Sequence, residues 1–167
     1  LGISGRYEFK NKGIDVFIDA MGQLNRNNGL GKEVLAFILV PAGHAGANKE
    51  LLHNLELPYQ AVTSTDLYLT HYLNDSANDP VMNRIRAQKL RNSEEDKVKI
   101  FFVPSYLNGD DGVFNMPYYD LLVGMDLTAF PSYYEPWGYT PLESLAFKVP
   151  TITTTLAGFG LWVKEHY

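Results

Sequence analysis

The residues best suited to chemistry lie in one stretch, residues 130–143, which reads FPSYYEPWGYTPLE. The apolar residues 127–130 predict a buried strand just before it. Thr140, Pro141 and Glu143 then fit a helix start, with the threonine as N-cap, the proline at the first helical position and the glutamate completing a capping box. A helix N-terminus offers free backbone N–H groups and a positive dipole end, which suit phosphate. The stretch therefore predicts a phosphate site beside a carboxylate and aromatic rings.

Two cations stand near the start of the chain. Arg6 and Lys12 lie on either side of the turn between a predicted strand at residues 1–6 and a predicted helix that begins at Asn11 or Lys12. An arginine makes forked contacts with phosphate and a lysine acts as a point charge, so the two suit a diphosphate. Alone they would more often be ordinary surface charges. Their coincidence with a second anion-binding helix start at Thr140 favours the diphosphate hypothesis.

Each carboxylate of the stretch has two interpretations. Glu135 lies in a loop rich in tyrosine and tryptophan, where carboxylates often contact sugars, but a turn-capping acid explains it equally well. Glu143 is fully explained by the capping box with Thr140, and the residue types alone favour that role over ligand binding.

The composition narrows the class of protein. The chain has 167 residues, 46% apolar and 20% charged, which suits one globular domain. A net charge of −5 argues against a nucleic-acid partner. There is no cysteine, no apolar run long enough for a membrane span and no signal-peptide pattern, so a cytoplasmic protein is expected. The chain begins inside a predicted strand, and we interpret it as a piece of a longer protein.

Several cofactor sites find no support in the sequence. The four histidines are separated and none has metal-ligand spacing: His44, His53, His71 and His166. No Asp-x-Asp pair is present to hold a metal–diphosphate, and neither a Gly-x-Gly-x-x-Gly nor a Walker-type loop occurs. A nicotinamide enzyme and a nucleoside triphosphatase are therefore not indicated.

Strands and helices alternate along the chain. Strands are predicted at residues 1–6, 34–40, 98–103, 127–130 and 149–153, and helices at 11–27, 79–91, 117–123, 140–147 and after 158. This pattern predicts an α/β fold with a Rossmann-like parallel sheet and helices on both faces. In such a fold the ligand lies beyond the carboxyl ends of the strands. Arg6 and the loops 104–118, 131–140 and 154–160 should therefore face a common crevice. Residues 41–79 are weakly patterned, and we expect an insertion or lid there with above-average mobility.

Two strings then carry a family resemblance. Residues 5–13, GRYEFKNKG, and residues 133–143, YYEPWGYTPLE, resemble the glycogen synthases of glycosyltransferase family 3, the eukaryotic type. Glu135 and Glu143 give the E-x7-E spacing of retaining transferases built from two Rossmann-like domains, the GT-B architecture. That spacing alone is weak, but within these strings it is specific. The resemblance covers most of the chain outside residues 41–66, where eukaryotic members are longer, so this chain resembles a compact bacterial-type version.

The resemblance implies roles for individual residues. Arg6 and Lys12 match the pair that holds the donor diphosphate and stabilises it as it leaves. Glu135 matches the acid that contacts the transferred glucose, and Glu143 matches an acid often assigned to the donor ribose.

Four further residues match the nucleotide side of that site. Gly138, Tyr139 and Thr140 match the helix start whose backbone amides also take phosphate. Tyr118 matches, less securely, an aromatic residue that stacks on the base.

The resemblance also implies a reaction and its partners. Residues 1–167 would be a single truncated C-terminal donor domain, with the N-terminal acceptor domain absent. The full-length enzyme would transfer glucose from UDP-glucose or ADP-glucose to the 4-OH of an α-1,4-glucan such as glycogen with retention, and would need no metal or other cofactor. No nucleic acid or membrane is expected as a partner, and a homo-oligomer is allowed. Two alternatives stay open: another retaining glucosyltransferase of the sucrose- or trehalose-synthase type, and a non-catalytic glucan-binding module.

Overall fold

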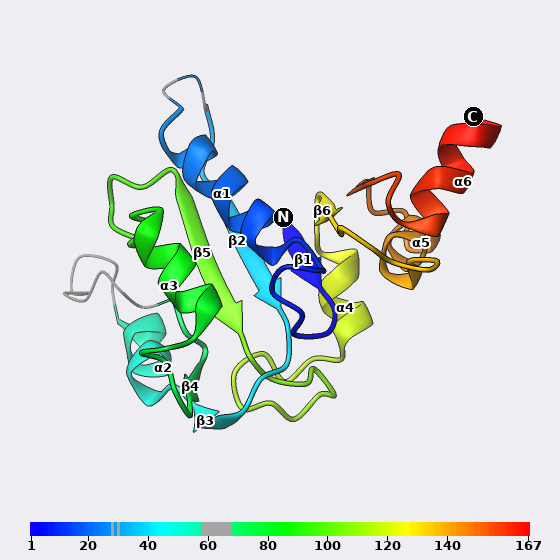
Figure 1. The fold of residues 1–167 in the computed structure, drawn as a ribbon. Helices are drawn as coiled ribbons and strands as arrows, with labels where there is room; N and C mark the ends of the chain where they lie inside the picture. The colour runs from blue at the N-terminus through cyan, green and yellow to red at the C-terminus, as the bar shows by residue number, and fades with distance from the viewer. Residues whose placement is uncertain (28, 30, 58–67) are drawn as a thin grey trace.

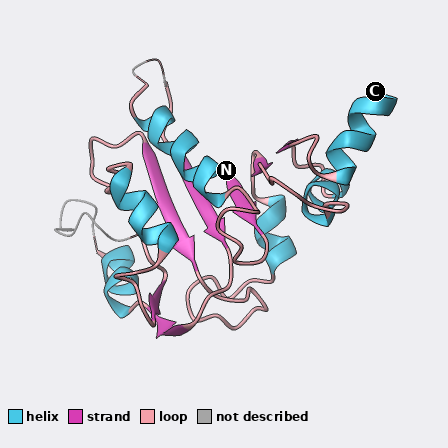
Figure 2. Cartoon of the chain, viewed as in Figure 1, coloured by secondary structure: helices cyan, strands magenta, loops and turns pink. Residues whose placement is uncertain are grey.

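A five-stranded parallel sheet organises the chain (Figures 1 and 2). The computed structural model describes residues 1–27, 29, 31–57 and 68–167. Along the sheet the strands follow the order β5 (Val98–Val103), β2 (Val34–Leu39), β1 (Gly2–Ser4), β6 (Thr128–Phe130) and β7 (Thr151–Thr153). Every neighbouring pair is parallel. Numbered by chain order within this sheet, the strands run 3-2-1-4-5, so the order reverses at β1. The predicted Rossmann-like α/β fold is confirmed.

Helices flank the sheet as the alternation predicts. They are α1 (Ile14–Asn25), α3 (Pro80–Ala87), α4 (Tyr118–Val123), α5 (Tyr139–Ala146) and α6 (Gly158–His166). Figure 1 shows α1 and α3 in front of the half of the sheet that β2 and β5 form. The apolar spacing of α1 places Phe17 and Ile18 on its buried face. There they share one core with Ile85 of α3 and with the buried strand residues Ile38 and Ile100. Within the part of the chain that the structure describes, no helix has the length and apolar character that a membrane crossing requires.

Residues 41–79, expected to be an insertion or lid, contain a small unit of their own. Its two strands, β3 (His44–Ala47) and β4 (His71–Leu73), pair antiparallel, and α2 (Lys49–Glu56) lies between them in the chain. The unit is attached to the main sheet at Phe102, whose amide donates to the Tyr68 carbonyl over 2.7 Å and whose carbonyl accepts from the Thr70 amide over 3.1 Å. Residues 58–67 of the predicted insertion lie outside the described residues, and its role as a lid stays a prediction.

The predicted capping box at Thr140 is wrong. The helix begins at Tyr139, two residues before the predicted first helical residue Pro141, and its N-cap is Gly138, in the left-handed conformation at φ 101°. Thr140 lies inside the first turn and no side chain caps the helix. The tertiary contacts of the preceding loop set this start, because the Trp137 carbonyl accepts a 2.6 Å hydrogen bond from the Phe159 amide. Glu143 therefore does not act as the cap partner of Thr140.

Two other helix boundaries differ from the sequence prediction. Helix α1 begins at Ile14 rather than at Asn11 or Lys12, because Gly13 takes a left-handed conformation at φ 67° before it. Helix α3 starts where predicted, with Asp79 as N-cap, but ends at Ala87 rather than near residue 91.

Candidate functional site

The loops that follow β1 and β6 meet where the strand order reverses. The amide of Tyr133, in the loop after β6, donates a 2.9 Å hydrogen bond to the carbonyl of Asn11, in the loop after β1. Gly13 lies so close to Pro131 that a Cβ on this glycine would come 2.0 Å from the proline carbonyl oxygen. The two loops are thus packed together at the position where open parallel sheets bind their ligands.

An ion pair joins these loops through two of the predicted site residues. The Nζ of Lys12 is hydrogen-bonded to Oε2 of Glu135. Only 15% of the lysine side chain and 20% of the glutamate side chain are exposed. Burial lowers the pKa of the Lys12 amine; the charge of Glu8 opposes this shift and the charge of Arg6 adds to it. An ammonium group in such a place needs an anionic partner, and Glu135 supplies it.

Arg6 lies on the same loop as Lys12, but its side chain is more exposed to solvent. Its side chain is 77% exposed, and Nε contacts the Glu8 carboxylate at 3.2 Å. The other oxygen of Glu8 accepts a 2.7 Å hydrogen bond from the Asn11 side chain. Sequence reasoning gave Glu8 no role, although it stands within the same GRYEFKNKG string. The contact leaves the terminal nitrogens of the guanidinium available to a ligand.

A third loop, residues 154–160, is hydrogen-bonded to the Glu135 loop. The hydroxyl of Thr154 donates to the Ser132 carbonyl over 2.7 Å, and the Gly158 amide donates to the Glu135 carbonyl over 3.0 Å. A Cβ on Gly158 would stand 2.2 Å from the Pro136 carbonyl oxygen, so only glycine allows this approach. The predicted convergence of the loops after β1, β6 and β7 is therefore seen in these contacts.

The start of α5 presents the expected backbone donors. The first amides of a helix have no partner within it. Among the described residues, no acceptor is found for the amides of Gly138, Tyr139 or Thr140. A Cβ on Gly138 would stand 3.5 Å from Cγ of Glu135, which places the helix start directly beside the carboxylate of the ion pair. An anion bound at these amides would lie close to Lys12.

Tyr118 and Glu143 belong to a second group of contacts beside the first. The Tyr118 hydroxyl lies 2.7 Å from Oγ of Ser4, at the carboxyl end of β1, and burial raises the pKa of this tyrosine. Glu143 accepts a 3.2 Å hydrogen bond from the hydroxyl of Tyr119, and its charge raises the pKa of that tyrosine. Sequence reasoning missed Ser4, which no motif marks. Glu143, which does not cap the helix, thus has Tyr119 as a side-chain partner, and its role at the ribose stays a prediction.

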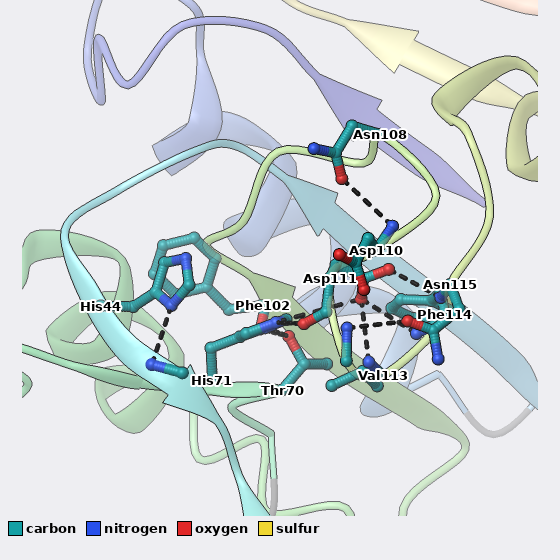
Figure 3. Close-up of polar contacts among 12 residues, drawn as sticks. His44, Thr70, His71, Phe102, Asn108, Asp110, Asp111, Val113, Phe114 and Asn115 are labelled. Carbon is teal, nitrogen blue, oxygen red and sulfur yellow. Dashed lines mark hydrogen bonds and ion pairs between the residues drawn. The ribbon is translucent and has the colours of Figure 1, made fainter.

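The loop after β5 is ordered by a buried histidine and an aspartate (Figure 3). His71 is fully buried, and its Nε2 donates a 2.8 Å hydrogen bond to the Asp111 carbonyl. The Asp111 carboxylate accepts from three amides of its own turn at 3.1, 2.9 and 2.7 Å: Val113, Phe114 and Asn115. These bonds shape the part of the 104–118 loop that the sequence predicted would face the crevice.

Two of the histidines that are separated in sequence are neighbours in space. The rings of His44 and His71 lie 4.7 Å apart (Figure 3), and burial lowers the pKa of His44. In the described ranges no group of three or more histidine, aspartate or glutamate residues could hold a metal ion.

The structure brings some of the predicted site residues into contact and leaves Arg6 apart from them. Lys12, Glu135 and the α5 start lie together, whereas Tyr118 and Glu143 contact Ser4 and Tyr119. For Arg6, the described residues show contact with Glu8 but none with the α5 start. Its place on the same loop as Lys12 leaves its role in diphosphate binding a prediction.

Known proteins resemble this chain over nearly its whole length. The family model for glycogen synthase matches residues 1–67 and 63–167. Glycogen [starch] synthase isoform 2 of Saccharomyces cerevisiae is 33% identical over 223 aligned positions, which cover 98% of this chain and 32% of the yeast protein. The glycogen [starch] synthase of Neurospora crassa is 32% identical over 97% of the chain and 31% of its own length. The liver enzyme of Rattus norvegicus is 31% identical over 99% of the chain and 31% of its own length.

The chain therefore spans about a third of the length of these relatives. The yeast alignment has 223 positions against 167 residues here, so the relative carries additional residues within the matched region. The two segments of the family match meet at residues 63–67, near the region where longer members were expected to differ. The family match and the identity to these relatives over nearly the whole chain show that this chain belongs to the glycogen synthase family.

Proposed function

We propose that this chain is the donor-binding part of a retaining glucosyltransferase that extends an α-1,4-glucan from a nucleotide-glucose. The observation that carries the proposal is the Lys12–Glu135 pair beside the open amides of the α5 start. It puts a cation, a carboxylate and a positive helix end within one site at the reversal of the strand order. A diphosphate needs the first and third of these, and a sugar needs the second.

The proposed reaction breaks the bond between C1 of glucose and the diphosphate and forms one between C1 and the acceptor 4-OH, whose proton leaves with the diphosphate. Negative charge grows on the departing diphosphate. Lys12, Arg6 and the α5 amides would oppose that charge where it develops, which is electrostatic stabilisation of the transition state. Glu135 would orient the sugar and favour its cationic character. Because protein groups supply this stabilisation, we propose that the full-length enzyme retains its activity in EDTA.

Nucleotide binding tests the donor site directly. We expect the 167-residue chain to bind UDP or ADP weakly in titration calorimetry and to show no glucosyltransferase activity. Lys12→Ala together with Arg6→Ala should weaken binding at least about tenfold, because each removes a charged partner of the phosphates. Lys164→Ala, which removes a cation from α6, is the matched control. Wild-type affinity in the double variant would refute the diphosphate roles.

The acceptor must be tested in the full-length protein. We expect transfer to glycogen, with no transfer to fructose or glucose 6-phosphate. Transfer to either of the small acceptors instead would favour a sucrose- or trehalose-type synthase. Parallel assays with UDP-glucose and ADP-glucose identify the donor. A cytoplasmic location and self-association of the full-length protein are further expectations, checked by fractionation and light scattering.

A further inference from the structure

The Lys12 amine already has an anionic partner before any donor arrives. Its hydrogen bond to Glu135 joins two side chains that are each at least four-fifths buried. The function proposed above assigns Lys12 to the diphosphate and Glu135 to the sugar. A diphosphate that approaches Lys12 therefore meets a carboxylate at the same place, and the two anions repel each other.

The backbones on both sides of this pair are held firmly. The Lys12 amide donates to the Glu8 carbonyl over 2.9 Å, and Gly13 is packed against Pro131. On the other loop the Glu135 carbonyl accepts from Gly158 over 3.0 Å. An exchange of partners at Lys12 thus requires only rotation of the two side chains, with the loops left in place.

Building on the proposed function, we propose that Glu135 determines the selectivity of this site for the nucleotide sugar over the bare nucleoside diphosphate. Both ligands must displace Glu135 from Lys12 to seat their phosphates. The nucleotide sugar compensates, because its sugar hydroxyls donate to the released carboxylate. A bare diphosphate leaves that carboxylate partly buried, without a partner and beside a new negative charge, which is costly.

The same exchange would help the product to leave. After transfer, the site holds a nucleoside diphosphate with no sugar, and Glu135 can return to Lys12 as the diphosphate departs. The ion pair would then compete with the product more than with the donor. In this way one carboxylate would both contact the sugar and limit inhibition by the released nucleotide.

A double-mutant cycle on the full 167-residue chain tests this proposal. Titration calorimetry with UDP and UDP-glucose, and in parallel with ADP and ADP-glucose, is run on wild type, Glu135→Gln, Lys12→Met and the double variant. Glutamine keeps the shape of the side chain and removes its charge. Glu94→Gln, in an exposed loop, removes the same charge elsewhere and serves as control. Thermal unfolding checks that each variant is folded.

We expect Glu135→Gln to bind the bare diphosphate at least about fivefold more tightly than wild type, while affinity for the nucleotide sugar does not rise. In the Lys12→Met background the same substitution should change diphosphate affinity less than about twofold, because the pair is already broken. The control should match wild type. Unchanged or weaker diphosphate binding in Glu135→Gln, or an equal gain without Lys12, would overturn the proposal.

The failure of this inference can be told apart from failure of the proposed function. If wild type binds none of the four ligands, the donor site itself is wrong and both proposals fall. If wild type binds them and loses affinity with Arg6→Ala plus Lys12→Ala, the donor site stands. The selectivity role of Glu135 then stands or falls on the cycle alone.

Discussion

Gly13 and Pro131 are in direct backbone contact, and this contact holds the two halves of the candidate site together. A Cβ on Gly13 would lie 2.0 Å from the Pro131 carbonyl oxygen, and the residue has φ 67°. A side chain there would both clash and strain the backbone. The glycine therefore lets the Lys12 loop approach the Glu135 loop.

Gly13→Ala should accordingly damage stability and ligand binding together. We expect a loss of at least about 2 kcal/mol in the free energy of unfolding and at least about tenfold weaker nucleotide binding. Urea unfolding and titration calorimetry measure the two effects. Gly31→Ala, where no atom of the described residues lies within 4 Å of the added Cβ, should stay within about 0.5 kcal/mol of wild type. Equal behaviour of the two variants would show that the loops do not depend on this contact.

The corrected start of α5 makes a prediction about capping. Because Gly138 is the N-cap and Thr140 makes no cap bond, Thr140→Ala should change the free energy of unfolding by less than about 0.5 kcal/mol. At α2 the side chain of Asn48 does cap the helix, accepting from the amides of Glu50 and Leu51, so Asn48→Ala should cost about 1 kcal/mol or more. Chemical denaturation compares them. If Thr140→Ala lowers the free energy of unfolding by about 1 kcal/mol or more, Thr140 caps the helix after all.

Tyr7 links the Arg6 loop to helix α3. Its hydroxyl donates to Oδ2 of Asp79, whose other oxygen accepts from the Met82 amide over 2.9 Å. Burial, with a further contribution from Asp79, raises the pKa of this tyrosine. Tyr7→Phe leaves a buried carboxylate oxygen without its partner, so we expect a loss of about 1–3 kcal/mol by urea denaturation. Tyr72→Phe, at an exposed position, is the control and should be neutral. A neutral Tyr7→Phe would mean that the bond does not stabilise the fold.

The pairing of α1 with α3 predicts an acid-sensitive contribution to stability. Arg84 donates to Asp19 through Nε at 2.6 Å, and this hydrogen bond is the largest of the influences that lower the pKa of Asp19. A carboxyl whose folded-state pKa is lowered stabilises the protein above its ordinary pKa of about 4, and the contribution disappears as the pH falls through the folded-state value. The pair is partly exposed, so about 0.5–1 kcal/mol is at stake.

Arg84→Gln should therefore be less stable than wild type at pH 7, with a difference that shrinks towards pH 3. Urea midpoints across this range measure it. Arg86→Gln is the matched control, because among the described residues Arg86 donates only to the neutral Ser76 carbonyl and Asn83 side chain. A difference between Arg84→Gln and wild type that persists unchanged at pH 3 would show that packing, and not the ion pair, is responsible.

The sequence by itself determined the fold class, the family and the two strings that carry the site. Apolar periodicity is a local property, so strands such as β5 and the buried face of α1 could be predicted from it. The meeting of loops at the carboxyl ends of parallel strands follows from topology alone, which is why the predicted neighbourhood of Lys12 and the residue 131–140 loop is seen in the structure.

Only the tertiary structure decided which side chains pair and where helix α5 begins. The capping pattern at Thr140 satisfied every local rule, yet the backbone bond from Phe159 to Trp137 and the left-handed Gly138 set a different start. The Lys12–Glu135 pair joins residues 123 positions apart, and nothing in either string identifies its partner. Local patterns report the preferences of a few neighbouring residues, whereas ion pairs and loop contacts depend on the whole chain having folded.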